Sequence, residues 1–444
     1  MISAILTVQH THAQKTWTLD NCIAYALENS LEQELQAQSI SISKAQWQQS
    51  KRNLIPSIRI SYPAYRVSFG RTLDAVTNEF VEKRFVSGIS SGISSSVTLF
   101  QTFRKWHNLA YQKIKYQSDK LSAKQAQYDL AFNIMDLFSN VLFQEGALEI
   151  IKEQQQAGKI QYKYISKKVA LGLLAKSDLY EIEATASAQA LEVLKAENQL
   201  NAAKLALLQE MNLSDPEITL VPELRSSEMD SSYTHSANHI FQLSLQVLPS
   251  LQISALQVEA ARKNLAVSKS AFFPTISLSG SIGTSYSDNF NNALGETVPF
   301  SDQITNNQNK SIGLSLSFPI FGNGRVWNEV KIARISLEKA RTQLTINQQK
   351  TFKIIQELTQ KSEALLAEKQ LNEKKLLAKN QAYLIAIKKF EKELTTHYDL
   401  QIAENSYLST KIEQVRLNIQ IAIQNRYLDY YSGSFILPTI MSSN

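Results

Sequence analysis

The chain repeats itself, and this duplication constrains its fold more than any other feature of the sequence. The segment around Pro56 returns around Pro274, a shift of 218 residues. From Leu99-Phe100 onward the shift is 221 residues, and that register holds without a gap to Asp178-Leu179, which returns as Asp399-Leu400. Chance similarity does not keep one register for that long. The period far exceeds that of a solenoid, so the chain duplicates a whole half-domain.

Within each repeat the hydrophobic period changes in the same order. An opening helix is predicted at about 18–53 and again at 237–271, each ending just before a proline. Two strands with period 2 then follow, at about 57–69 and 86–100 in the first repeat and at about 274–287 and 311–321 in the second. Polar loops, at about 70–85 and 288–310, join the strands of each pair.

Two long helices complete each repeat. The chain is helical for roughly 65 to 70 residues before Gly172 or its equivalent Glu393, and helical again to about 212 and 431. Each predicted arm is on the order of 100 Å long, too long to fold back into one globule. The resulting organisation is a first repeat at 14–213, a linker at 214–239, a second repeat at 240–431 and a C-terminal tail at 432–444.

The predicted strands have one apolar face and one face of small polar residues. In the second strand Ile89, Ile93 and Val97 alternate with serines and Gly92. The first strand changes phase after Pro63, which predicts a bulge or kink there. Three of the four strands are free of charged residues, as an outer face in contact with lipid requires.

Four strands are too few to close a barrel, for which about eight is the practical minimum. Because lipid cannot hydrogen-bond open sheet edges, the chain is expected to oligomerise. Two copies would give a barrel filled by side chains, whereas three would give a wider lumen that suits the serine-rich faces. The long helices, whose apolar residues follow heptad-like spacing, are expected to pack sideways against similar helices. Those positions in one arm are Leu121, Tyr128, Phe132, Met135, Phe138 and Leu142.

Several classes of function find no support in the sequence. No nucleophile elbow, phosphate loop or metal pair is present, so no catalytic, cofactor or metal site is predicted and the protein is not expected to be an enzyme. Cys22 is interpreted as a buried helix residue. The net charge of +6 is scattered at helical spacing, which is typical of solvated helix faces and argues against nucleic acid as a partner.

The N-terminal segment 1–13 is a possible signal peptide. Its short apolar stretch is followed by small residues at the positions that a signal peptidase reads before a cut after Ala13. The segment lacks a basic start, so a disordered terminus is the alternative. No run approaches the roughly 20 apolar residues of a transmembrane helix.

The whole chain resembles the TolC-like outer-membrane efflux protein family. The resemblance rests on the two repeats of helix, strand, loop, strand and paired long helices, and on the run Ile-Phe-Gly-Asn-Gly-Arg at 320–325. The clearest local matches are the turn at 170–179, Ala-Leu-Gly-Leu-Leu-Ala-Lys-Ser-Asp-Leu, and its counterpart ending Tyr398-Asp399-Leu400. These motifs are short, but their order is preserved along the chain.

The resemblance implies an α+β membrane protein that acts as a homotrimer. Each protomer would give four strands to a shared 12-stranded barrel, and antiparallel coiled-coil helices would continue it as a periplasmic α-barrel. The protein would lie in the outer membrane of a Gram-negative bacterium and conduct substrates passively. Its partners would be outer-membrane lipid, a periplasmic membrane-fusion adaptor and an inner-membrane pump. Drugs, metal ions and secreted proteins are all compatible substrates.

The resemblance also places candidate residues at the periplasmic tips. Gly172, Leu173 and Leu174 resemble the turn that contacts the adaptor, and Ser177 and Leu394 share the two turns. A structural alternative is that Gly172 merely lets the chain reverse between helices.

A ring of carboxylates gates the pore in the relatives, and it would favour cations. Asp178 and Asp399 match positions of that gate, with Thr395 standing where the relatives have an arginine. The sequence departs from the family pattern again at Ile402, where relatives have a second aspartate, and at Phe390, where they have a tyrosine. The alternative for both aspartates is helix N-caps. The alternative for the whole chain is a soluble periplasmic coiled-coil scaffold or adaptor protein, whose strands would form a small sandwich.

Overall fold

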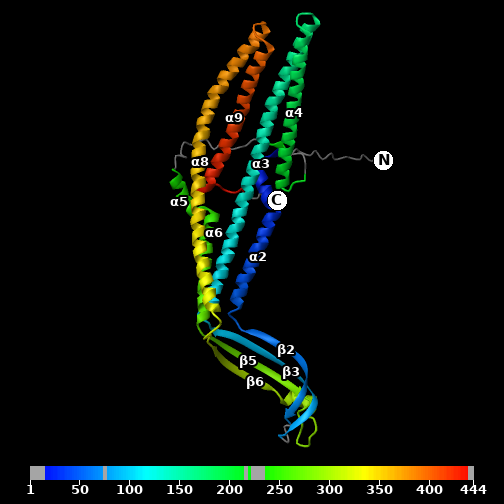
Figure 1. The fold of residues 1–444 in the computed structure, drawn as a ribbon, viewed down its shortest axis with the longest axis vertical. Coiled ribbons are helices and arrows are strands. Elements are labelled where there is room, and N and C mark those ends of the chain that lie inside the picture. Colours follow the sequence, from blue (N-terminus) through cyan, green and yellow to red (C-terminus); the bar gives the residue numbers. More distant parts are fainter. Residues whose placement is uncertain (1–15, 74–77, 215–218, 222–235, 439–444) are drawn as a thin grey trace, which may run out of the picture. The chain divides into compact units, whose positions relative to one another are not determined.

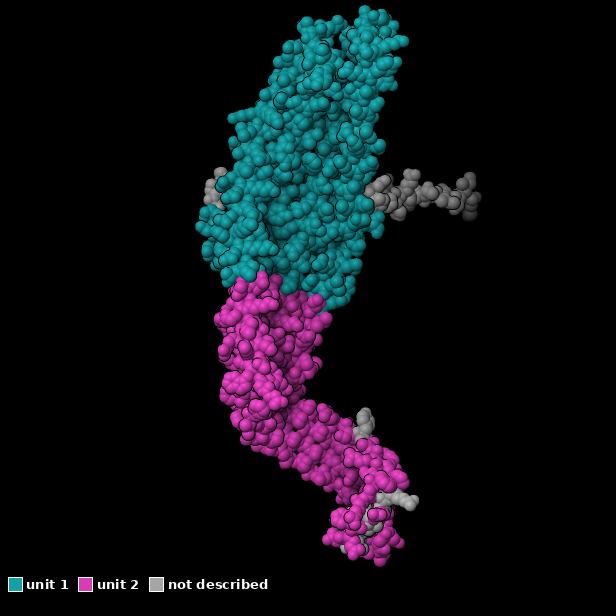
Figure 2. All heavy atoms as spheres, viewed as in Figure 1, with its two compact units in different colours: residues 1–38, 121–252, 345–444 teal, residues 39–120, 253–344 magenta. Residues whose placement is uncertain are grey.

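The computed structural model describes residues 16–73, 78–214, 219–221 and 236–438. The chain divides into two compact units, coloured separately in Figure 2. The helical unit comprises residues 1–38, 121–252 and 345–444, and the sheet unit comprises residues 39–120 and 253–344. The possible signal peptide at 1–13 lies outside the described residues.

The two repeats have the same order of elements (Figure 1). The first consists of β1 (Thr16–Trp17), α1 (Leu19–Asn29), α2 (Leu31–Arg52), β2 (Ser57–Leu73), β3 (Phe80–Phe100), α3 (Arg104–Ala170) and α4 (Lys176–Glu210). The second consists of β4 (Thr219–Leu220), α5 (Ala237–Val247), α6 (Pro249–Lys269), η1 (Ser270–Phe272), β5 (Thr275–Ser287), α7 (Phe300–Asn306), β6 (Asn309–Ser317), α8 (Arg325–Glu391) and α9 (His397–Ser432). Helices α3 and α8 have 67 residues each. Within the described residues, no helix combines the length and the apolar character needed to cross a bilayer.

Each predicted opening helix is in fact two helices, so the prediction of one continuous helix was wrong. Ser30 separates α1 from α2, and Leu248 separates α5 from α6; both have extended backbone. Pro249 explains the second break, because the residue before a proline avoids the helical region. Ser30 precedes no proline, yet it lies 218 residues before Leu248. The break is therefore a shared property of the duplicated fold.

The four long strands form one antiparallel sheet in the order β2-β3-β5-β6. The bulge predicted near Pro63 is confirmed, since the register of β2 against β3 shifts between Ser61 and Ala64. Because of this bulge, the apolar residues of β2 after Pro63 lie on the same face of the sheet as those before it. Ile60 lies opposite Ile93 before it, and Tyr65 lies opposite Ile89 after it, so both fall on one face.

Three strand boundaries differ from the expected ones by four residues or more. β2 ends at Leu73 rather than at about 69. β3 begins at Phe80 rather than at about 86, because it pairs with the end of β2 as far as Leu73. β6 ends at Ser317 rather than at about 321, just before a stretch with Pro319, which lacks the N–H that a sheet ladder uses. The loop after β5 contains α7, whose buried Gln303 amide accepts from Ser287 N–H and donates to the carbonyls of Ser287 and Val298.

The main core of the helical unit gathers residues from α1, α3, α4 and α9. Ile134, Phe138 and Leu207 are fully buried in it. Cys22 is also fully buried there, as expected, and burial raises the pKa of its thiol to about 12. The segment after α9 is more than a tail, because the Phe435 side chain enters this core and stacks near Phe132, with 5.3 Å between the ring centroids.

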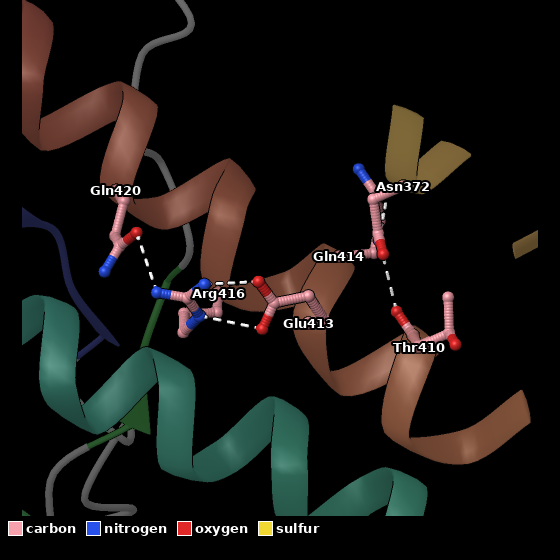
Figure 3. A network of polar contacts seen from close by, with 6 residues as sticks. All are labelled: Asn372, Thr410, Glu413, Gln414, Arg416 and Gln420. Atoms are coloured by element: carbon pink, nitrogen blue, oxygen red, sulfur yellow. Dashed lines mark hydrogen bonds and ion pairs between the residues drawn. The ribbon is translucent and has the colours of Figure 1, made fainter. Parts of the chain in front are cut away.

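A buried polar network joins α8 to α9 (Figure 3). The Asn372 amide nitrogen donates to the Thr410 carbonyl at 3.3 Å and to the Gln414 side-chain oxygen at 2.9 Å. One turn further along α9, Arg416 holds the Glu413 carboxylate through two nitrogens. A single buried amide in an apolar helix seam favours one helix register, because any shift would leave it without partners.

Candidate functional site: the two hairpin tips and the sheet faces

The two hairpin tips have the same backbone design. After α3, the Leu173 N–H donates to the Lys168 carbonyl at 2.9 Å, and after α8 the Leu394 N–H donates to the Lys389 carbonyl at 2.8 Å. Each bond closes a Schellman-type turn, which needs a residue in the left-handed region just before the donor. The duplicated chain therefore reverses by the same means at both tips.

The residues in that left-handed position differ. Gly172, with φ of +72°, meets the need without strain, since it has no Cβ. Glu393, with φ of +61°, takes the same position in the second tip and is strained there. A strained backbone persists only when its surroundings hold it in place.

The side chain of Glu393 has such a partner. Its carboxylate forms an ion pair and hydrogen bond with the Lys168 ammonium, which lies at the end of α3 in the other hairpin. The hydrogen bond lowers the pKa of Glu393 and raises the pKa of Lys168. Tyr164 and Phe390 also meet across the two hairpins, with 6.2 Å between ring centroids. The tips of one protomer are thus joined to each other.

Neither Asp178 nor Asp399 is a helix N-cap, so that alternative was wrong in detail. Each is the third residue of its helix, and its carboxylate accepts from the backbone N–H of the capping residue, Ala175 or Thr396. Only Thr396 can return a side-chain hydrogen bond, and its hydroxyl accepts from Asp399 N–H at 3.1 Å. Both carboxylates therefore close the first turn of a helix.

Asp399 is the more strongly held of the two carboxylates. Its Oδ2 accepts from the hydroxyls of Thr396 at 2.7 Å and Thr395 at 3.1 Å. These bonds, that of Thr396 above all, hold the pKa of Asp399 below its usual range. An ionised carboxylate at a helix N-terminus is also stabilised by the positive end of the helix dipole.

A groove of about 610 Å³ lies between the tips of the two hairpins. Leu174, Asp178 and Thr395 line it, whereas Asp399 is not part of its lining. His397 lines it as well and is half-buried, without a hydrogen-bond partner for either ring nitrogen among the described residues. Burial lowers the pKa of His397, while the charge of Glu181 acts in the opposite direction.

The tips also carry exposed apolar side chains. Leu173 and Leu394 are 66% and 70% exposed, and Ser177 is exposed next to them. Clustered exposed leucines usually mark a surface that meets a partner. Sequence reasoning missed Lys168, Glu393 and His397. The sequence did contain a signal for Glu393, because a glutamate stands there at the turn position that Gly172 occupies in the first repeat.

Along several rungs of the sheet, the residues paired across neighbouring strands are either all apolar or all small and polar. Leu278 lies opposite Val97 on one side and Leu314 on the other, while Ser281 lies between Ser94 and Ser311. Residues opposite each other in a sheet point to the same face. One face is therefore mainly aliphatic, interrupted on β3 by Ser91 and Ser95. The other face is a ladder of hydroxyls, in which Ser281 and Ser311 are hydrogen-bonded at 2.8 Å.

The apolar face is uncovered within the chain. Ile312, Leu314 and Leu316 are each more than two-thirds exposed. The outer strands of the sheet, β2 and β6, each pair on one side only among the described residues. An exposed apolar face is unfavourable in water, and unpaired strand edges can pair with further strands.

Comparison with known proteins gives one match to a family model and several matches in fold. Residues 240–434 match the family model described as outer membrane efflux protein. The fold of nearly the whole chain matches that of CusC, with a TM-score of 0.80 over 94% of this chain and 92% of that chain at 17% identity. The family match covers the second repeat, less than half of the chain, and the match in fold extends to nearly all of it.

The chain is also similar to two further outer-membrane proteins, one in fold and one in sequence. VceC from Vibrio cholerae has a TM-score of 0.78 at 16% identity, covering 94% of this chain and 96% of VceC. The outer membrane protein TolC of Escherichia coli strain K12 is 26% identical over 268 residues, which is 59% of this chain and 53% of TolC. The chain thus spans about half the length of the curated relatives that it matches.

Proposed function

We propose that this chain is one protomer of a homotrimeric outer-membrane exit duct. In this proposal each protomer gives its four strands to a closed 12-stranded barrel, and the long helices form a periplasmic α-barrel in a Gram-negative bacterium. The duct passively conducts substrates of an efflux or type I secretion system from a periplasmic adaptor and an inner-membrane pump to the exterior.

The sheet carries the proposal. Its aliphatic face, its serine face and its two half-paired edges, β2 and β6, match what a barrel segment in lipid needs. Four strands cannot close on themselves, and three copies give a lumen wide enough for water. The solved structure of CusC is described in terms of transmembrane channel formation, which supports the same role for this chain.

The hairpin tips would form the periplasmic end of the duct. Gly172, Leu173, Leu174, Ser177 and Leu394 are the proposed adaptor contacts, because the exposed leucines form a surface without cover in the protomer. Asp178, Asp399 and Thr395 are the proposed gate residues. Three copies of the ionised Asp399 would form a ring of like charge that favours cations at a narrow opening.

The experiment that tests the duct is a measurement of oligomer mass and conductance. We expect the protein to be extracted from outer membranes only by detergent, to have the mass of a trimer, and to give small single-channel currents in planar bilayers. Asp399→Ala should change the current and its cation preference, whereas Lys374→Ala, an exposed substitution in α8, should not. A water-soluble monomer or dimer without conductance would contradict the duct and favour a periplasmic coiled-coil scaffold.

A further inference from the structure

A cavity of about 740 Å³ lies at the end of the sheet where β3 passes into α3. Arg52 at the end of α2, together with Arg104 and Lys105 at the start of α3, contributes cationic side chains to its lining. The rest of the lining is mostly amide and hydroxyl side chains, including Ser57 and Ser96, and it contains no carboxylate. The cavity therefore combines three positive charges with neutral hydrogen-bonding groups.

The three cations have no countercharge in the described part of the chain, since none of them forms an ion pair there. Arg104 and Lys105 are nevertheless half-buried. Partly desolvated like charges repel each other and lose hydration, and a bound anion relieves both penalties. Guanidinium groups are suited to this role because they bind phosphate and carboxylate oxygens in pairs.

The second repeat serves as an internal comparison. Arg325 corresponds to Arg104, and its Nε lies 3.8 Å from the carboxylate of Glu329, one turn along α8. The residue that corresponds to Glu329 in the first repeat is Asn108, which lines the cavity. The arginine at this strand-to-helix junction thus has a carboxylate one turn away in the second repeat, and the corresponding arginine of the first repeat has an amide there.

The remaining positions differ in the same direction. Lys105 corresponds to Val326, and Arg52 corresponds to Ser270. At these positions the first repeat has two cationic residues that the second repeat lacks, and it has no counterpart of the Glu329 carboxylate. Most of the sheet residues that line the cavity lie on the serine face, among them Ser57 and Ser96, which lie opposite each other and are linked through their hydroxyls. Val97 is the lining residue from the other face.

We propose that this cavity binds an oxyanion of the phosphate class through Arg52, Arg104 and Lys105. The site is contained within one chain and does not depend on the duct, so it goes beyond the proposed function. A phosphate group reaches such a site either as a soluble anion or as the headgroup of an anionic lipid. The serine face favours the soluble source, since lipid tails would meet the opposite, aliphatic face.

The test measures binding to the full chain purified in an uncharged detergent at low ionic strength. Inorganic pyrophosphate is titrated by calorimetry in one arm, and phosphatidylglycerol is compared with phosphatidylethanolamine by native mass spectrometry in the other. The double variant Arg52→Gln/Arg104→Gln should lower affinity for the bound anion by about tenfold or more. The matched variant Arg325→Gln should leave it unchanged within about twofold, because that arginine already has a carboxylate partner.

A further variant separates the site from general effects on folding. Asn108→Glu keeps all three cations and supplies the carboxylate that the second repeat has, so it should abolish binding while thermal stability stays at the wild-type value or above. Binding of pyrophosphate alone would identify a soluble anion as the ligand, and selective binding of phosphatidylglycerol would identify a lipid headgroup. Equal binding by wild type, Asn108→Glu and the double variant in both arms would overturn the proposal, as would an equal loss in Arg325→Gln.

Discussion

The ammonium of Lys168 and the carboxylate of Glu393 form an ion pair that joins the two hairpin tips of one protomer. Lys168 is mostly buried, with its side chain 18% exposed, whereas Glu393 is 74% exposed. Glu393 reaches Lys168 from a left-handed backbone position that its repeat counterpart gives to glycine. The strained turn and the ion pair between the tips therefore meet in one residue.

Glu393→Gly should separate the turn from the link. Glycine suits the left-handed backbone, so the turn remains, but the two tips lose their connection. Amide hydrogen exchange at 392–396 and at 168–174 should become faster by a factor of about two to five. Glu391→Gln, a control two residues away, should leave both rates unchanged; faster exchange in the second tip alone would mean that the ion pair does not couple them.

The same link should hold over a defined pH range. The pKa of Glu393 is lowered, so its contribution is present above the ordinary glutamate pKa of 4.5 and is lost as pH falls through the lowered value. The pKa of Lys168 is raised, so its contribution is present below 10.5 and is lost as pH rises through the raised value. Between pH 4.5 and 10.5 both groups keep their charges, so titration of this ion pair should not change the amide hydrogen exchange of the hairpin tips.

His397 should make the groove between the tips sensitive to acid. Burial lowers its pKa from 6.5, so the folded tip prefers the neutral ring, and stability present above pH 6.5 is lost as pH falls through the lowered value. Glu181, Asp178, Glu393 and Lys168 also line the groove, and of these Glu181 opposes the effect. Lowering the pH from 7.5 to about 5.5 should speed amide exchange around 396–400 in wild type. His397→Phe, which keeps a ring near Phe390, should remove that response; an unchanged response would exclude His397 as its source.

Gly322 and Gly324 form a matched pair for backbone strain. A Cβ would meet no atom within 4 Å at either position, but only Gly324 has a left-handed backbone, with φ of +74°. Gly324→Ala should therefore lower the free energy of unfolding by about 1–2 kcal/mol, and Gly322→Ala should change it little. Thermal unfolding in detergent measures both, and equal effects would refute the assignment of strain to position 324.

The first repeat has the same two left-handed residues at this junction, Thr102 and Phe103, where the second has Asn323 and Gly324. Phe103→Gly should consequently raise the free energy of unfolding by about 1 kcal/mol, because it relieves the backbone strain. The loss of the ring contact between Phe103 and Phe100 reduces this gain. A rise in the unfolding temperature checks this expectation. A fall would show that the aromatic contact outweighs the strain.

Asn372 should be a stabilising residue despite its polarity. Asn372→Ala removes two hydrogen bonds to α9 and leaves a void in a buried seam, so we expect a loss of about 1–3 kcal/mol. Lys374→Ala, on an exposed position of the same helix, should be nearly neutral. Denaturant or thermal unfolding monitored by circular dichroism distinguishes the two, and equal stability would mean that the network in Figure 3 adds nothing.

Neighbouring residues of β6 should respond oppositely if one face meets lipid and the other meets water. Leu314 belongs to the aliphatic face and Ser315 to the serine face. Leu314→Arg should reduce membrane insertion, by about 2–4 kcal/mol for a position near the middle of the bilayer, whereas Ser315→Arg should insert normally and alter conductance. Membrane fractionation and single-channel currents measure these effects. Equal insertion of both variants would contradict a lipid-facing sheet.

Periodicity and duplication in the sequence were sufficient for the order of the long strands and long helices, the two faces of the sheet and the bulge near Pro63, but not for α7 or the breaks in the opening helices. These properties depend on local backbone preferences and on alternation along the chain, which one sequence displays directly. The break at Ser30 was not predictable in the same way, because no proline or glycine marks it.

Only the tertiary structure decided which residues meet across the hairpins and at the strand-to-helix junction. Lys168 and Glu393 are 225 residues apart, and the basic cavity gathers side chains from α2, the sheet and α3. The sequence alone determined where the chain turns and which face of each strand is apolar. It did not determine the pairing of charges, because a contact between distant segments depends on how whole elements pack and not on the pattern within any one of them.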